Sequence, residues 1–368
     1  MEYRTLGRTG WQVSVIGMGC AMLGNFGMEH GVRLVRRELE WGVNYFDTAR
    51  IYGDSEIKLG IALQDVRERV FVSTKTNEPS EEGAWRQINE SLERLQFDYV
   101  NNIHLHSLES EEDIARRLGP GGALKALVRA REEGLTQFLG CTSHRADILL
   151  KALQRFPFDL ILVPMNLVER QPLEALIPYC RAHGVGITIM KPVATGLLPA
   201  RLALKWLRTQ PIDVAVPGVS TPAEVDEDLS AGEGEATLTP EGEEEVVRWQ
   251  EKLAHVRCRI CGECLPCPVG IPIHMHLGTD MMYDHYRTLG PEGFRAHSWG
   301  RAGMEADLAY RKARIAAIEA CTRCGACEAR CPYGLPIIEM LQSMLPGMRE
   351  IVPFSKPNSK NKPCKQTR

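Results

Sequence analysis

The residues of this sequence that could do chemistry stand where short apolar segments end. Three of them follow consecutive segments: Asp47, Lys75 and His106. Asp47 and Lys75 would form a buried ion pair that fixes both side chains. Tyr52 lies in the loop after Asp47 and could reach that pair. A phenol has a pKa of about 10, which a neighbouring ammonium lowers, so Tyr52 is predicted to act as a general acid toward a carbonyl oxygen.

His106 would orient and polarise the same oxygen, whereas His104 on the same segment is assigned a packing role. Each of these residues alone has an ordinary structural interpretation, as a stabilising ion pair or a hydrogen-bonded core histidine. As a set they favour function, because packing gives a core strand no reason to end on a charge.

The cysteines form a second set of candidate functional residues. Eight of the twelve cysteines fall in two groups after residue 257. The first group is Cys258, Cys261, Cys264 and Cys267, followed by Pro268, and the second is Cys321, Cys324, Cys327 and Cys331, followed by Pro332. The second group matches the Cys-x2-Cys-x2-Cys-x3-Cys-Pro run that binds [4Fe–4S] clusters, and the first has one residue fewer in its last gap.

In such runs the fourth cysteine commonly binds the other cluster. We therefore expect one cluster on Cys258, Cys261, Cys264 and Cys331, and a second on Cys321, Cys324, Cys327 and Cys267. A pair of all-cysteine zinc sites is the alternative, but zinc sites usually pair two Cys-x2-Cys knuckles. The scattered cysteines and the histidines between the groups are expected to be idle or packed: Cys20, Cys141, Cys180, Cys364, His274, His276 and His285.

The elements that must position these residues repeat one pattern of apolar run, polar residue, loop and amphipathic helix. The predicted strands are Val13–Met18, Val43–Phe46, Val70–Ser73, Val100–Leu105, Gln137–Cys141, Leu160–Val163, Gly186–Met190 and Asp213–Val216. Helices are predicted at Glu81–Leu95, Leu124–Glu133, Ala146–Arg155, Pro172–His183 and Pro199–Thr209, with a hairpin over residues 1–12. Eight strand–helix units favour a closed (β/α)8 TIM barrel over an open doubly wound sheet.

The rest of the chain is predicted to form a second domain of the α/β protein. We expect the barrel at residues 1–235, an acidic linker and connecting helix at 236–256, a mostly α-helical ferredoxin-like iron–sulfur domain at 257–350, and a disordered tail at 351–368. A typical barrel uses about 250 residues, which leaves enough chain for such a domain.

Composition excludes several classes of protein. The chain has 368 residues, of which 44% are hydrophobic and 25% charged, as in ordinary globular proteins. A net charge of −3 gives no field that would attract nucleic acid. No apolar run reaches the roughly 20 residues of a membrane span, and the first residues lack a secretion pattern, so a cytoplasmic protein without membrane contact is expected.

Several motifs together resemble the aldo-keto reductase superfamily. They are Tyr3-Arg-Thr-Leu-Gly-Arg-Thr-Gly10, Phe46-Asp-Thr-Ala-Arg-Ile-Tyr-Gly-Asp-Ser-Glu56, Ser73-Thr-Lys75, His106 and Pro217-Gly-Val-Ser-Thr221. The whole architecture is similar to the branch with a C-terminal ferredoxin-type domain. The resemblance implies a catalytic tetrad of Asp47, Tyr52, Lys75 and His106, with hydride delivered by NADH or NADPH.

The resemblance also implies where the nucleotide binds. The expected contacts are Thr142, Ser143, Asn166, Lys191, Gly218, Ser220 and Thr221. The sequence departs from the family pattern at Leu162, where a glutamine is usual, and at Met190, where an aromatic residue is usual. Residues 217–219 offer no basic side chain for a 2′-phosphate, although backbone amides near Thr221 could bind phosphate at a helix N-terminus.

Two functions follow as hypotheses. The first is an oxidoreductase that reduces an aldehyde or ketone, or oxidises a sugar-like alcohol, with the two [4Fe–4S] clusters relaying electrons. Hydride transfer moves two electrons and a cluster moves one. Either a flavin or radical step couples them, or an external ferredoxin exchanges electrons through the clusters, or the clusters are structural; no flavin motif is evident. The alternative is an electron-transfer or docking subunit with a catalytically idle barrel.

Overall fold

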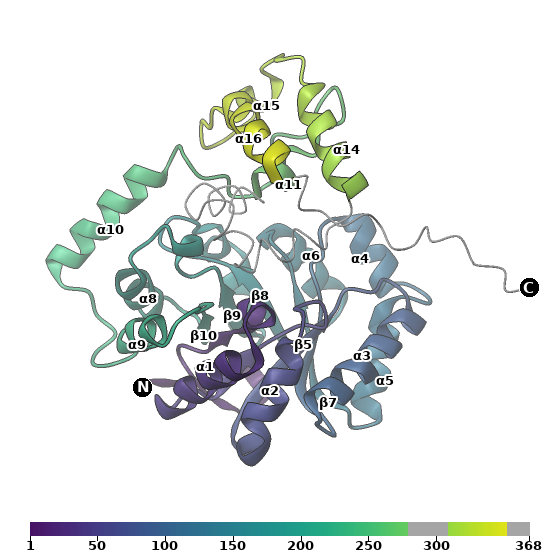
Figure 1. Cartoon of the computed structure of the whole chain (residues 1–368), viewed down its shortest axis with the longest axis vertical. Coiled ribbons are helices and arrows are strands. Elements are labelled where there is room, and N and C mark those ends of the chain that lie inside the picture. The colour runs from purple at the N-terminus through teal and green to yellow at the C-terminus, as the bar shows by residue number, and fades with distance from the viewer. Residues whose placement is uncertain (279–307, 352–368) are drawn as a thin grey trace, which may run out of the picture. The chain divides into compact units, whose positions relative to one another are not determined.

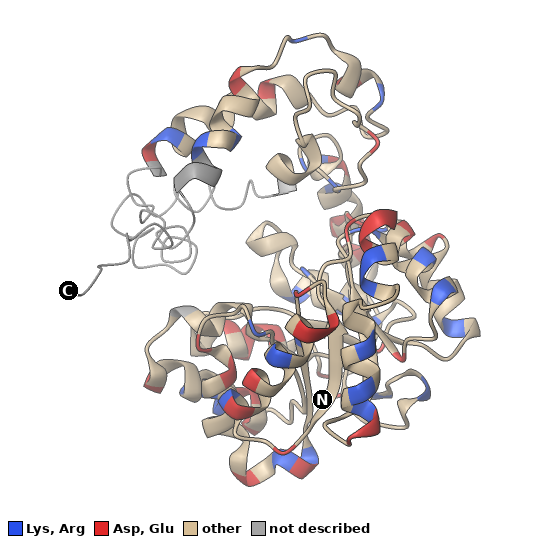
Figure 2. Ribbon diagram, turned by 90° about the vertical axis from the view of Figure 1, so that its right-hand side faces the viewer, with Lys and Arg blue, Asp and Glu red and all other residues tan. Residues whose placement is uncertain are grey.

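The computed structural model describes residues 1–278 and 308–351. Its contacts divide the chain into two compact units, Met1–Glu251 and the residues from Lys252 onward. In the part of the chain described, no helix is both long and apolar enough to cross a membrane. Basic and acidic residues are interspersed along the helices of the first unit (Figure 2).

The first unit is a parallel barrel of eight strands, in the order β3 to β10. They are β3 (Met18–Gly19), β4 (Tyr45–Asp47), β5 (Phe71–Thr76), β6 (Val100–Leu105), β7 (Thr136–Thr142), β8 (Leu160–Pro164), β9 (Gly186–Met190) and β10 (Val214–Val216). A parallel bridge between Ile16 and Ala215 joins the first and last strands. The predicted closed barrel is therefore confirmed, and the open sheet is excluded.

Helices surround the strands (Figure 1). They are α1 (Met28–Glu40), α2 (Ser55–Leu63), α3 (Glu81–Leu95), α4 (Glu111–Leu118), α5 (Ala123–Glu132), α6 (Ala146–Arg155), α7 (Leu176–Ala182), α8 (Ala200–Arg208) and α9 (Pro222–Ser230). A further helix, α10 (Pro240–Leu253), crosses the boundary between the two units. The predicted bounds of α3 and α6 agree with the structure. Helix α7 begins later than the predicted Pro172, because Gln171–Leu173 forms a separate 3-10 turn.

The N-terminal hairpin pairs β1 (Tyr3–Thr5) with β2 (Gln12–Ser14). Its Leu6 and Val13 join an apolar cluster with Tyr45, Phe71 and Leu160. Because this cluster draws on strands around the whole barrel, its members face the interior. Side chains alternate along a strand, so Asp47, which is two residues after Tyr45, and Ser73 and Lys75, which follow Phe71 at the same spacing, face the interior too.

In its described residues the second unit is helical, without strands. Its helices are α11 (Ile273–Gly278), α14 (Leu308–Glu319), α15 (Ala326–Ala329) and α16 (Ile337–Ile351). Ile271, Ile273, Leu335, Ile337 and Leu341 are among the residues that form its core. His285, Cys364 and nearly all of the predicted tail lie outside the described residues.

Candidate functional site

Asp47 and Lys75 form a buried ion pair inside the barrel. Lys75 Nζ donates to Asp47 Oδ2 at 2.5 Å and to the carbonyl of Thr48 at 2.6 Å. Asp47 is 4% exposed and Lys75 2% exposed. Burial would lower the pKa of Lys75, but the charges of Asp47 and Tyr52 outweigh it and raise that pKa. Lys75 therefore remains an ammonium at neutral pH.

Tyr52 is held beside this pair by the turn between β4 and α2. Its backbone N–H donates to Ala49 O at 3.0 Å, and its carbonyl accepts from Ser55 N at 3.0 Å. Lys75 Nζ lies 5.0 Å from the centroid of the Tyr52 ring. Gly24 lies against the other side of the turn, where a Cβ would come within 2.2 Å of Tyr52 O.

The pKa of Tyr52 departs from the direction expected from the sequence. Burial raises the pKa of Tyr52 above its ordinary value, and the Lys75 ammonium opposes this without overcoming it. The expected net lowering of the Tyr52 pKa is therefore wrong. Burial destabilises the phenolate by more than the Lys75 ammonium stabilises it. Tyr52 is a protonated phenol at neutral pH, with its proton available.

His106 lies on the other side of Tyr52. The two rings meet edge to face with their centroids 5.8 Å apart. Burial lowers the pKa of His106 well below its ordinary value, and Lys75 lowers it further. The imidazole is thus neutral and retains one N–H that can donate to an oxygen. The structure therefore brings Asp47, Tyr52, Lys75 and His106 together.

The residues expected to hold a nicotinamide are engaged with their own loops. Thr142 Oγ1 accepts from Ser107 N at 2.7 Å, and Ser143 Oγ accepts from Arg145 N at 3.0 Å. Asn166 donates to Glu169 Oε2 at 2.7 Å and to Lys191 O at 3.2 Å.

Asn166 Oδ1 also accepts from the backbone N–H groups of Val168 and Glu169, both at 3.0 Å. Its amide is saturated, so it could contact a nucleotide only by giving up one of these bonds. Lys191 is half-buried and has a left-handed backbone, with φ at 55°.

The N-terminus of α9 is occupied by a carboxylate. Thr221 caps the helix by accepting from Glu224 N at 3.2 Å, and Glu224 Oε2 accepts from Ser220 N at 2.6 Å. Gly218, just before it, is exposed. A phosphate at these amides would have to displace or repel Glu224, which disfavours binding of a 2′-phosphate there.

Two buried cations that sequence reasoning missed support the site. Lys58 is fully buried and ties the loop before α1 to α2 by donating to Leu23 O at 2.7 Å and Phe26 O at 2.6 Å. Arg117 donates to His106 O at 2.7 Å and fixes the end of β6. The available signal for Lys58 was a pair of charged residues, Glu56 and Lys58, within an otherwise mostly apolar helix, Ser55–Leu63.

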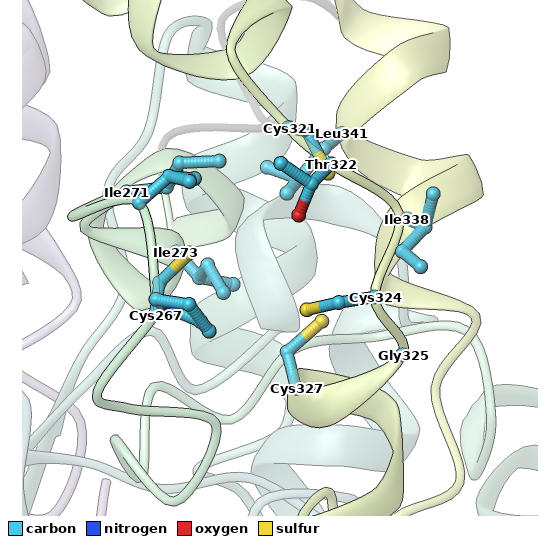
Figure 3. A pocket seen from close by; sticks show the side chains of 12 residues that line it. Cys267, Ile271, Ile273, Cys321, Thr322, Cys324, Gly325, Cys327, Ile338 and Leu341 are labelled. Atoms are coloured by element: carbon cyan, nitrogen blue, oxygen red, sulfur yellow. The ribbon is translucent and has the colours of Figure 1, made fainter.

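The cysteines gather around two separate pockets of the second unit. Cys267, Cys321, Cys324 and Cys327 line one pocket, and Cys258, Cys261, Cys264 and Cys331 line the other. Figure 3 shows the first pocket, with Cys321, Cys324 and Cys327 on one loop and Cys267 facing them from another segment. His274 lines the second pocket, and His276 Nδ1 accepts from Arg314 Nε at 3.0 Å.

The two cysteine loops repeat the same backbone. Ile260 and Arg323, each just before the second cysteine of its group, have φ of 54° and 55°. Gly262 and Gly325, each just after it, have φ of 82° and 75°. The Cys-Pro-x-Gly segments that follow are also equivalent, since Gly270 N donates to Cys267 O at 2.9 Å and Gly334 N donates to Cys331 O at 3.2 Å. The sequence carries the same repeat, because a glycine follows the second cysteine of each group and a Cys-Pro-x-Gly segment ends it.

The cysteines of the described residues are not gathered around a single point as the ligands of one ion would be. A zinc site brings four ligands to within about 2.3 Å of one ion. Among the described residues, no three His, Cys, Asp or Glu side chains converge in that way. Burial raises the pKa of Cys258 to about 12 and that of Cys264 to about 11, so these thiols must lose protons when a metal binds. Cys20, Cys141 and Cys180 are buried free thiols elsewhere.

Comparison with protein families divides the chain in two. Residues 15–201 match the aldo/keto reductase family. Residues 257–335 match a 4Fe-4S dicluster domain, and this range contains every cysteine of the two groups.

Individual proteins agree with the first match. L-galactose dehydrogenase of Arabidopsis thaliana is 37% identical over 232 residues, which cover 57% of this chain and 71% of that protein. An uncharacterized oxidoreductase of Bacillus subtilis, YqkF, is 27% identical over 212 residues, covering 54% of this chain and 67% of its own. Among solved structures, the holo form of aldo-keto reductase AKR11C1 from Bacillus halodurans superposes with a TM-score of 0.61 at 25% identity, covering 67% of this chain and 96% of its own.

Proposed function

Because the chain belongs to the aldo/keto reductase family, we propose that its barrel interconverts a carbonyl and an alcohol at the Tyr52 hydroxyl. The observation that carries this proposal is the contact of Lys75 with both Asp47, at 2.5 Å, and the Tyr52 ring, at 5.0 Å from its centroid. Asp47 and Lys75 would act through Tyr52, and His106 would donate its N–H to the substrate oxygen.

Carbonyl reduction needs a hydride at carbon and a proton at oxygen. A bound dihydronicotinamide would supply the hydride and leave as the oxidised nucleotide. Tyr52 would supply the proton, and the Lys75 ammonium beside it would stabilise the phenolate that forms. In the reverse direction the same phenolate would accept the alcohol proton.

The nucleotide is the less well supported partner. The amide of Asn166 is saturated by protein contacts, so it does not fit a nicotinamide amide without rearrangement, whereas the hydroxyls of Thr142 and Ser143 each accept one hydrogen bond and keep an O–H donor. Glu224 at the α9 N-terminus favours NADH over NADPH, because it repels a 2′-phosphate. A flavin would need a site that these residues do not suggest.

The second unit would hold two [4Fe–4S] clusters, for which its thiols fit. We propose Cys258, Cys261, Cys264 and Cys331 as ligands of one cluster and Cys321, Cys324, Cys327 and Cys267 of the other, since each set lines one pocket. Such clusters exchange single electrons, so we propose a redox protein such as a ferredoxin as the partner of this unit.

The Tyr52→Phe variant tests the barrel half of the proposal. With NADH or NADPH and the activated aldehyde 4-nitrobenzaldehyde, or with NAD⁺ or NADP⁺ and L-galactose as the alcohol, kcat/KM should fall by at least about a hundredfold. Tyr179→Phe, on the outer helix α7, is the matched control and should retain full activity. Unchanged turnover in Tyr52→Phe would contradict the assignment of Tyr52 as the residue that transfers the proton.

Anaerobic titration with NADH and NADPH separates this proposal from an idle barrel. Nucleotide binding with bleaching of the cluster absorbance at about 400 nm would support an oxidoreductase whose clusters relay electrons. Binding without bleaching would support a reductase with structural clusters. If neither nucleotide binds or changes the cluster absorbance, while dithionite still reduces the clusters, the docking or electron-transfer subunit would be favoured.

A further inference from the structure

Several polar side chains inside the barrel have buried atoms without a hydrogen-bond partner in residues 1–278 and 308–351. These atoms include Asp47 Oδ1, Asn102 Oδ1, both ring nitrogens of His104 and Nδ1 of His106. Asn102 and His104 are fully buried. Burying a polar atom without a hydrogen bond costs free energy of folding, so this set of atoms requires a physical explanation.

The strand register places most of this group in one patch. Asp47 on β4 is aligned with Ser73 on β5, and Ser73 is aligned with Asn102 on β6. Asn102 Nδ2 donates to Ser73 Oγ at 2.8 Å. Two residues further along the strands, Lys75 is aligned with His104. Because aligned residues of a parallel sheet share a face, these side chains occupy neighbouring positions in the barrel interior.

Gly140 on β7 makes room for the His104 ring. Gly140 is the register partner of both His104 and the interior residue Leu160. A Cβ on Gly140 would lie 2.2 Å from His104 Nδ1. Because Gly140 has no side chain, the His104 ring can lie against β7 at this position. The packing role expected from the sequence leaves both ring nitrogens of His104 without a partner.

The surroundings of His104 keep it neutral. Burial lowers the pKa of His104 well below its ordinary value, and the charges of Lys75 and His106 act in the same direction. The titratable groups that act on Lys75 are Asp47, Tyr52 and Cys20. A neutral imidazole has one N–H donor and one acceptor nitrogen.

We propose that His104 and Asn102 hold a buried water molecule against Asp47 Oδ1, and that His104 is thereby a positioning residue for the Asp47–Lys75 pair. The chemistry of the three atoms is complementary to one water. Asp47 Oδ1 and Asn102 Oδ1 both accept, and His104 donates through its N–H. A water has two donor hydrogens for the two oxygens and can accept the His104 N–H with one of its two lone pairs, and three polar partners are what a buried water usually has.

This water would fix the orientation of the Asp47 carboxylate. Asp47 Oδ2 is already committed to Lys75 Nζ, and Oδ1 is the free end of the same group. A donor on Oδ1 stabilises the ionised carboxylate and so keeps Lys75 protonated beside Tyr52. The positioning role rests on the function proposed for Tyr52, whereas the presence of the water does not.

Crystal structures of the full holo-chain test the water itself. The wild type should show a density peak within hydrogen-bond distance of Asp47 Oδ1, Asn102 Oδ1 and a ring nitrogen of His104. His104→Gln, which keeps a donor and an acceptor, should retain the peak, and His104→Leu should lose it. Absence of the peak from the wild type, or a ring nitrogen bonded directly to a protein group, would overturn the proposal.

Kinetics with 4-nitrobenzaldehyde test the positioning role. His104→Leu should lower kcat/KM about tenfold and shift the alkaline limb of its pH profile to lower pH, because Lys75 would lose its proton more easily. His104→Gln should restore the wild-type profile. Ile103→Val, a buried change on the same strand, controls for loss of stability and should leave the profile unchanged.

A His104→Leu enzyme with a wild-type pH profile would overturn the positioning role even if the water is present. A wild type that reduces no carbonyl would instead contradict the function proposed for Tyr52. The crystallographic result would still decide whether the water exists, so the two failures are distinguishable.

Discussion

Replacing Lys75 with methionine removes the charge that accompanies Asp47 in the barrel. Lys75 and Asp47 are 2% and 4% exposed, so the carboxyl left behind stays out of water. Breaking one partner of a buried pair typically costs about 3–5 kcal/mol. For a unit of about 250 residues each kcal/mol corresponds to roughly 2–4 °C, so the unfolding midpoint at pH 8 should fall by about 10 °C.

The loss should depend on pH in a defined direction. Burial raises the pKa of Asp47, and Lys75 is the group that opposes it, so Lys75→Met raises that pKa further. A carboxyl whose folded pKa exceeds its unfolded value binds more protons in the folded state. Its contribution to stability is present at low pH and is lost as pH rises through the folded pKa. Lys75→Met should therefore be closer to the wild type at pH 5 than at pH 8.

The assay is thermal unfolding followed by circular dichroism between pH 5 and 8, together with NADH-dependent turnover. Asp47→Asn/Lys75→Met is the matched control, because it removes both charges and should abolish the added pH dependence. Turnover should be lost in both variants. If the loss of stability relative to the wild type were the same at pH 5 and pH 8, or larger at pH 5, the buried-pair reasoning would be refuted.

Three further predictions concern other parts of the chain. Cys331→Ala should reduce the iron content from about eight to about four atoms per chain, while Cys180→Ala leaves it unchanged; stoichiometric zinc in the wild type would contradict the cluster assignment. Glu38 is 1% exposed and burial raises its pKa, with Asp228 adding to the effect, so Glu38→Met should stabilise the barrel by about 1–2 kcal/mol at pH 8 and by less at pH 5, in thermal unfolding. A pH-independent gain would show that Glu38 does not titrate. Gly140→Ala should destabilise by about 1–3 kcal/mol, since its Cβ would lie 2.2 Å from His104 Nδ1, and His104→Ala should suppress part of that loss in a double-mutant cycle.

The sequence alone determined the architecture of both units. Regular alternation of apolar runs and amphipathic helices specified eight parallel strands, because a parallel strand needs a crossover helix and buried faces. Cysteine spacing specified cluster binding, because ligation by a short loop fixes which residues can reach one metal group. Both patterns lie within short stretches of the chain, so they can be recognised from the sequence alone.

The electrostatic state of the site was decided by tertiary structure. The sequence correctly suggested that Lys75 lies near Tyr52, but not that burial would outweigh the ammonium and raise the pKa of Tyr52. Desolvation depends on everything packed around a group, and that information is spread over many strands.

Tertiary structure also decided which polar atoms are already in use. Asn166 stands at a strand end that suggested nucleotide binding, yet its amide is saturated by its own loop. His104 was expected to be packing, yet register with Lys75 and the gap at Gly140 place a neutral imidazole beside the ion pair. Residue type sets what a side chain can donate or accept, and only the packed barrel determines which partners remain available to it.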